Sequence, residues 1–182
     1  RGQILVATYP LVGNYGVPVD PGNGSIGLDE RGVPLLFESG RVQVSGLVVS
    51  GACGRPSHYA SGMTLSAWLA AAGVPGISGV DTRALTQLLR ERGTMRGFIV
   101  PADSDVMPDD KETGHAVSEV SPGGVRVYEA AGAGSGRGRA PRIALVDCGA
   151  KANILRCHFA PGVTVIRGPW AHDLSGIQHD AV

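Results

Sequence analysis

The sequence RIALVDCGAKANILRCHFAPGVTVI, residues 142–166, carries the clearest fold signal in the chain. It opens with an aliphatic run at 142–147, typical of a buried strand, and reaches a turn at Gly149. A short helix is expected over residues 152–158, and a Pro-Gly turn then leads into a second strand at 163–166. Two consecutive strands joined by a helix run parallel, because the helix returns the chain to the starting edge of the sheet. The stretch therefore predicts an α/β fold with a parallel sheet.

The first hundred residues carry a second pattern of strands and helices. The predicted elements, in order, are a strand at 3–8, a long Gly- and Pro-rich loop at 17–40, a strand at 42–50, a helix at 65–72, a very short strand within 73–79, a helix at 82–92 and a short strand at 97–100. Thr64 and Asp81 are the expected N-caps of the two helices, and Gly73 and Gly93 are expected to end them.

Beyond residue 100 the pattern weakens, and residues 130–140 are almost entirely Ala, Gly, Ser and Arg. Such a composition cannot bury enough apolar surface to offset its ordering entropy. We therefore predict an N-terminal domain at 1–129, a flexible linker at 130–141 and a second domain that begins at 142–182. Both ends are expected to be cut, because the first domain opens directly on a core strand and some forty residues are too few for an independent α/β core. The alternatives are a short processed N-terminus, and a second domain that the first domain or a partner chain completes.

The composition excludes several classes of protein. The net charge is zero, with 16 basic and 16 acidic side chains, which removes any global attraction to nucleic acid or to an anionic membrane surface. No apolar run approaches the roughly 20 residues of a membrane-spanning helix. The three cysteines, Cys53, Cys148 and Cys157, are an odd and sparse set, which favours free thiols and a reducing, cytoplasmic location.

Asp147, Cys148 and Gly149 follow the first predicted parallel strand, at the edge where open α/β sheets bind ligands. Cys148 could be a nucleophile and Gly149 part of a phosphate turn. A phosphate loop needs several glycines, however, and the nearest base in the sequence is His158, one helix away. A small buried thiol is the favoured interpretation of Cys148.

The cysteines and histidines lack zinc-ligand spacing, and Cys157 is interpreted as a core-facing helix residue. His58 is interpreted as a surface or hydrogen-bonding loop histidine, with a catalytic histidine as the alternative. Arg83 lies in the first turn of its helix, where a cation opposes the helix dipole. It therefore either pairs with a carboxylate, in the fold or across an interface, or is an exposed arginine.

Four segments together resemble a known family in order and in spacing. They are GQILVATYPLVGNYG (2–16), VDTRALT (80–86), LRERGTM (89–95) and DCGAKANILR (147–156). The family is the small, glutamine-using part of carbamoyl phosphate synthetase. The Asp-Cys-Gly variant and the Pro-Ser-His loop at 56–58 are more similar to the eukaryotic pyrimidine-pathway enzymes than to the separate bacterial subunit.

The resemblance implies an N-terminal α/β domain of the synthetase small subunit, followed by the first βαβ portion of a Rossmann-like class I glutamine amidotransferase domain. In that family a cysteine on a strand-to-helix elbow attacks glutamine, with a histidine as base and a glutamate that orients it. The released ammonia passes to a synthetase part, a large subunit or fused domains. That part uses ATP, a divalent metal ion and bicarbonate to make carbamoyl phosphate for pyrimidine or arginine biosynthesis.

The resemblance also implies that this chain holds no catalytic, substrate-binding or metal-binding residue and no cofactor. The elbow and the His-x-Glu pair follow Val182 in the family order, and a serine that contacts glutamine precedes Arg1. Cys148 does not match the nucleophile. Lys151, Asn153 and Arg156 match a family motif and are assigned to domain packing and interface contacts. The alternatives are a non-catalytic module that docks on a synthetase, and a stand-alone nucleotide-binding protein, which the single glycine of the first turn disfavours.

Overall fold

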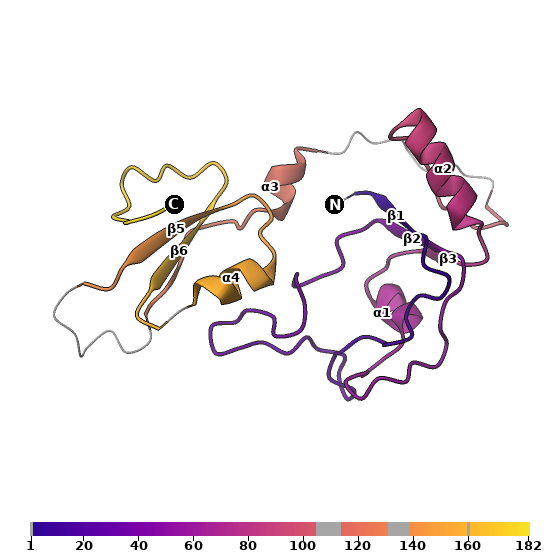
Figure 1. The fold of residues 1–182 in the computed structure, drawn as a ribbon, viewed down its shortest axis with the longest axis horizontal. Coiled ribbons are helices and arrows are strands. Elements are labelled where there is room, and N and C mark those ends of the chain that lie inside the picture. The colour runs from indigo at the N-terminus through magenta and orange to yellow at the C-terminus, as the bar shows by residue number, and fades with distance from the viewer. Residues whose placement is uncertain (1, 105–113, 131–138, 160) are drawn as a thin grey trace. The chain divides into compact units, whose positions relative to one another are not determined.

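The computed structural model describes residues 2–104, 114–130, 139–159 and 161–182. Within these residues the chain forms four helices and six strands, and the strands make up two three-stranded sheets (Figure 1). The α/β class predicted from the sequence is confirmed. The chain divides into two compact units, one of Arg1–Gly27 with Gly40–Thr113 and the other of Leu28–Ser39 with Gly114–Val182.

The first unit contains a parallel sheet with strand order β1-β2-β3. Its elements are β1 Ile4–Ala7, β2 Gly46–Val49, α1 Leu65–Ala71, β3 Gly76–Ile77 and α2 Thr82–Arg92. Leu47 and Val49 of β2 pack with Leu69 of α1, so the core of this unit lies between α1 and the sheet.

Both helices of the first unit begin where the sequence predicts; α2 also ends there, and α1 ends at Ala71, one residue before the predicted end. The Thr64 hydroxyl accepts a hydrogen bond from the Ala67 amide at 3.1 Å, and the Asp81 carboxylate accepts one from the Ala84 amide at 2.9 Å. Each bond satisfies an amide that has no partner inside its helix. The glycine that follows each helix has a positive φ, +66° for the first and +78° for the second. Glycine adopts such a backbone without strain.

The second unit contains a mixed sheet with strand order β4-β6-β5. Its elements are α3 Ala116–Val120, β4 Arg126–Tyr128, β5 Arg142–Asp147, α4 Ala152–His158 and β6 Thr164–Pro169. β5 and β6 are parallel and β4 is antiparallel to β6, so the predicted βαβ arrangement is confirmed. The core combines Tyr128, Ala152, Leu155 and Val165 with Val33, a residue from the long N-terminal loop.

Three elements differ from the prediction. The strand expected at 97–100 is wrong: these residues are irregular, and Ile99 instead covers β2, where a Cβ on Gly46 would lie 2.7 Å from the Ile99 side chain. α3 and β4 were not predicted, because each is five residues or shorter and lacks a full period of apolar residues.

Most of the predicted linker, residues 131–138, lies outside the described residues. The predicted division into domains at 1–129 and 142–182 stays a prediction. The two compact units are defined by contacts, and each combines segments that are separated in the sequence.

Candidate functional site

The carboxyl ends of β5 and β6 are the edge at which the sequence predicts ligand binding. Asp147, the last residue of β5, is completely buried. One carboxylate oxygen accepts hydrogen bonds from the amides of Gly149 and Ala150, at 2.7 and 2.6 Å. The other accepts from Nε of Arg167 at 2.5 Å. The carboxylate is therefore occupied in holding the turn after β5.

Arg167, whose side chain is partly exposed, pairs with the buried Asp147 from the neighbouring strand β6. Burial alone lowers the pKa of Arg167, but its interactions with Asp147, and then with Tyr128, outweigh the burial and raise that pKa. The guanidinium therefore remains charged opposite the carboxylate. Such a pair is costly to break from one side, because the remaining charge is left buried without a partner.

The thiol of Cys148 is exposed and free, so the expectation of a buried thiol is wrong. Successive side chains of a strand point to opposite faces, and Asp147 takes the inward position at the end of β5. Cys157 is likewise free and exposed, which corrects its interpretation as a core residue. α4 buries Ala152 and Leu155, and Cys157 lies two residues beyond that face.

A serine ties α3 to the same edge. The Ser121 hydroxyl, just after α3, donates to the carbonyl of Asp147 at 2.7 Å and accepts from the amide of Trp170 at 2.9 Å. His115, the N-cap of α3, stacks on the Trp170 ring with centroids 4.8 Å apart. No spacing in the sequence signals these residues, because they come from separate short segments.

The beginning of α4 is bound by Glu38, which lies in the long N-terminal loop. Its carbonyl accepts from the amide of Ala152 and its carboxylate accepts from the amide of Asn153, both at 2.9 Å. Lys151, at the N-cap position itself, makes no side-chain cap. Glu38 therefore supplies the cap that the local sequence of α4 lacks.

Arg156, one turn along α4, holds the same loop. Its guanidinium donates to the carbonyls of Pro34 and Phe37 and forms an ion pair with Glu38 at 2.7 Å. The assignment of Arg156 to packing contacts agrees with this geometry, and Asn153 takes part through its backbone amide. The sequence identified Arg156 through its motif, but Glu38 had no signal, because it lies about 118 positions away in the chain.

The other residues singled out from the sequence lie apart from this edge. His58 accepts from the Ala60 amide at 3.2 Å and contacts the rings of Tyr15 and Tyr59, as expected of a hydrogen-bonding loop histidine. Cys53 is half-buried. In the part of the chain that the structure describes, no group of three or more His, Cys, Asp or Glu is placed to hold a metal ion.

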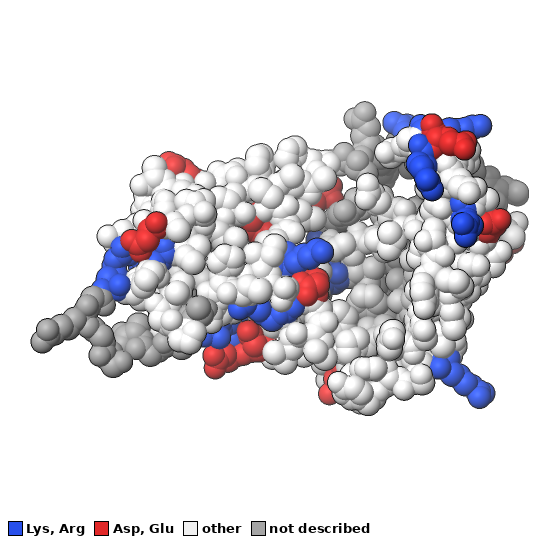
Figure 2. Space-filling view, in the orientation of Figure 1, with Lys and Arg blue, Asp and Glu red and all other residues white. Residues whose placement is uncertain are grey.

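Arg83 is exposed on α2, where basic side chains gather at the upper right of Figure 2. Its side chain has no hydrogen bond or ion pair with a described residue, so a carboxylate partner within these residues is excluded. Arg90 and Arg92 lie in the last turn of the same helix, where cations suit the dipole.

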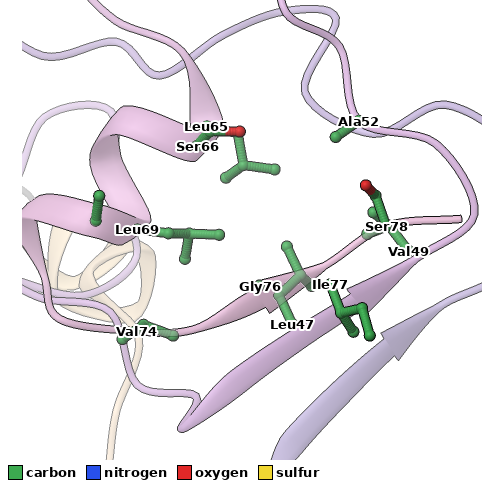
Figure 3. A pocket seen from close by; sticks show the side chains of 11 residues that line it. Leu47, Val49, Ala52, Leu65, Ser66, Leu69, Val74, Gly76, Ile77 and Ser78 are labelled. Carbon is green, nitrogen blue, oxygen red and sulfur yellow. The ribbon is translucent and has the colours of Figure 1, made fainter. Parts of the chain in front are cut away.

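An apolar groove lies between α1 and the strands β2 and β3 of the first unit (Figure 3). Leu65 and Leu69 point into it from α1, and Leu47 and Gly76 border it from the strands. Its volume is about 210 Å³, and none of the 11 residues around it is charged.

A comparison with family models matches residues 1–99 to the family described as "Carbamoyl-phosphate synthase small chain, CPSase domain". This chain belongs to the carbamoyl-phosphate synthase small-chain family. The resemblance found in the sequence is confirmed. The matched region contains every helix and strand of the first unit and also the loop segment of Glu38.

Relatives of the carbamoyl-phosphate synthase family extend over nearly the whole chain. The small chain of Pyrococcus furiosus is 40% identical over 181 residues, 96% of this chain and 45% of that protein. Multifunctional protein pyr1-3 of Dictyostelium discoideum is 36% identical over 183 residues, 95% of this chain and 8% of that protein. The mitochondrial carbamoyl-phosphate synthase of Homo sapiens whose name specifies ammonia is 35% identical over 182 residues, 100% of this chain and 11% of that protein.

This chain therefore spans less than half the length of each of these relatives. No helix among the described residues is both long and apolar enough to cross a membrane.

Proposed function

We propose that this chain is the part of a glutamine-hydrolysing carbamoyl phosphate synthase that supports assembly, and that it does not hydrolyse glutamine by itself. In the complete enzyme, ammonia from glutamine passes to a synthetase part, which makes carbamoyl phosphate from it with bicarbonate and ATP, for pyrimidine or arginine biosynthesis. The synthetase part is a separate large chain or a fused stretch of the same polypeptide. ATP and a divalent metal ion belong to that part, and the expected location is the cytoplasm.

One observation carries this proposal: relatives with different names share nearly all of this chain. One is named a small chain, one a multifunctional protein, and one a synthase whose name specifies ammonia. A segment shared by proteins of these three descriptions is better suited to a common role in assembly than to the chemistry of one nitrogen donor.

The geometry after β5 supports the same conclusion. A catalytic cysteine needs a base, and that base needs an orienting acid. The acid nearest to Cys148 in the sequence is Asp147, whose two oxygens are engaged by the turn amides and by Arg167. Asp147 is therefore not free to take the orienting role.

Ammonia release by the purified chain in the presence of glutamine tests the proposal, with Cys148→Ala as the matched variant. We expect no release above the buffer from either protein. Release by the unaltered chain that Cys148→Ala abolishes would overturn the proposal and make Cys148 a nucleophile.

The alternative is a docking module whose complete protein has no glutamine chemistry at all. The uncharged groove beside α1 favours a binding role for this chain in either case. Glutaminase activity of the complete protein separates the two, since only the proposed enzyme requires it.

A further inference from the structure

The histidine that caps α3 has two partners at once. Nδ1 of His115 accepts a hydrogen bond from the Ser118 amide at 3.4 Å, and the same ring stacks on Trp170 with an angle of 24° between the two planes. Nδ1 can accept only in the neutral ring that carries its proton on Nε2. Histidine is the side chain whose charge ordinarily changes between about pH 5 and pH 8. The cap of α3 is therefore sensitive to pH in this range, unlike the Thr64 and Asp81 caps of the first unit.

A proton on the ring changes its two contacts in opposite directions. It removes the acceptor of the Ser118 amide and places a positive charge at the N-terminus of α3, where the helix dipole disfavours a cation. The same charge strengthens the contact with Trp170, because the face of an indole ring attracts a cation. The charged ring therefore releases the Ser118 amide and keeps Trp170. The Ser118 hydroxyl, which donates to the His115 carbonyl at 2.7 Å, is not affected by the proton.

Two segments meet at this ring, α3 and the residues after β6. α3 contributes Glu119, whose Oε1 would lie 3.0 Å from a Cβ on Gly114, the residue before His115. The residues after β6 contribute His172 and also Asp173, whose carboxylate is hydrogen-bonded within its own turn. Neither 114–121 nor 170–182 contains a lysine or an arginine, so no fixed positive charge of these segments opposes a proton on His115.

The other end of α3 is attached to the sheet by groups that do not titrate. The Ser121 hydroxyl donates to the Asp147 carbonyl at 2.7 Å and accepts from the Trp170 amide at 2.9 Å. The Asp147 carboxylate is paired with Arg167, so the two charges at these strand ends offset each other. A proton on His115 is therefore expected to change the first turn of α3 and to leave its last turn in place.

We propose that His115 is a pH-dependent cap, which opens the first turn of α3 on protonation while its ring stays on Trp170. The neutral ring holds the Ser118 amide and completes the helix. The charged ring leaves that amide to water, and α3 is then held at the edge of the sheet by the stack and by Ser121. This inference does not depend on the proposed function, because every group in it belongs to the second unit.

Nuclear magnetic resonance of the ¹⁵N-labelled chain between about pH 8 and pH 5 tests the cap. We expect the Ser118 amide to move away from the position of a hydrogen-bonded amide as the pH falls. His115→Asn keeps a side-chain oxygen at the N-cap without a titrating group, so its Ser118 amide should not move. His115→Phe keeps an aromatic ring on Trp170 without an acceptor. Its Ser118 amide should take the acid position at every pH.

The emission of Trp170, measured in a Trp68→Phe chain, follows the stack. A charged imidazole on the indole should quench this emission as the pH falls, and His115→Asn should abolish the quenching. His172→Gln is the matched control, and both transitions should persist in it. A Ser118 amide that keeps its position over the whole range, or that still moves in His115→Asn, would overturn the proposal. A rise of Trp170 emission in acid would overturn it as well, since the charged ring would then have left Trp170.

Discussion

Asp147 ends β5 as a completely buried carboxylate. Asp147 lies at the strand end where the sequence predicts chemistry, yet its oxygens bind two turn amides and Arg167. An acidic residue at the end of a parallel strand can serve catalysis or can hold the following turn. Only the hydrogen-bond partners of its carboxylate distinguish these two roles. In this chain they support turn formation, and the same contacts leave Cys148 exposed.

Glu38 provides the first stability test, because it joins the long N-terminal loop to α4. Glu38→Ala removes the acceptor of the Asn153 amide and the ion-pair partner of Arg156. We expect the free energy of unfolding to fall by about 0.5–2 kcal/mol from the cap, and by about 1 kcal/mol at most from the half-exposed pair. Urea unfolding measures this loss.

Glu30→Ala is the matched control in the same loop. Among the described residues Glu30 pairs only with its neighbour Arg31, at 3.1 Å, and its side chain is 79% exposed. Its removal is expected to change the free energy of unfolding by less than about 0.5 kcal/mol. Equal losses in the two variants would show that Glu38 is an ordinary surface charge.

Arg83 on α2 makes no side-chain hydrogen bond or ion pair with a described residue. Because its guanidinium has no partner among the described residues, Arg83→Ala and Arg83→Lys should leave the melting temperature unchanged. If a carboxylate of the synthetase holds the planar guanidinium by two hydrogen bonds, lysine keeps the charge and loses the geometry. Both variants should then weaken synthetase binding to a similar degree. Unaltered binding in both would make Arg83 a solvated surface charge.

The ends of the helices were the most predictable features of the fold, because N-caps and terminating glycines act on residues within one turn. Thr64, Asp81 and the glycines that follow the helices lie where the sequence places them. The strand expected at 97–100 fails for a non-local reason, since Ile99 is used to cover β2. β4 could not be predicted either, because its three residues form a strand only through their partner β6.

The cap of α2 can be tested at the level of the element. Asp81→Ala removes the acceptor of the Ala84 amide and should lower the free energy of unfolding by about 0.5–2 kcal/mol. Asp81→Asn retains a side-chain oxygen and should lose only the charge interaction with the helix dipole, about 0.3–1 kcal/mol. Thermal unfolding at low ionic strength compares the two. A larger loss in Asp81→Asn than in Asp81→Ala would contradict the capping role.

The second unit shows what the sequence could not reveal about the whole molecule. It is assembled from the loop segment Leu28–Ser39 and from residues beyond Gly114, which are separated by most of the first unit. The loop contributes Val33 to the core and Glu38 to the cap of α4. Local composition predicted this loop correctly as irregular, but its contacts with α4 depend on pairings across more than a hundred positions.

Limited trypsin digestion tests the organisation of the chain. The glycine-rich stretch predicted as a linker offers Arg137 and Arg139, and we expect the first cuts there. Cleavage after Arg142 should be slow, because Arg142 is part of β5 and Asp180 binds its backbone. The Arg142 amide donates to the Asp180 carboxylate and its carbonyl accepts from the Asp180 amide, both at 2.8 Å. First cuts after Arg90, inside α2, would contradict this expectation.

The nicked chain then distinguishes two ways of dividing the molecule. If the division at 130–141 separates independent domains, the fragments on either side should part on gel filtration under native conditions. The contacts of the second unit predict that they stay together, because β4, before the cut, pairs with β6, after it. The bonds between Arg156 and the Glu38 loop span the same cut. Co-elution in buffer and separation in urea are therefore expected. Adding Glu38→Ala to the nicked chain should lower the urea concentration at which the fragments part.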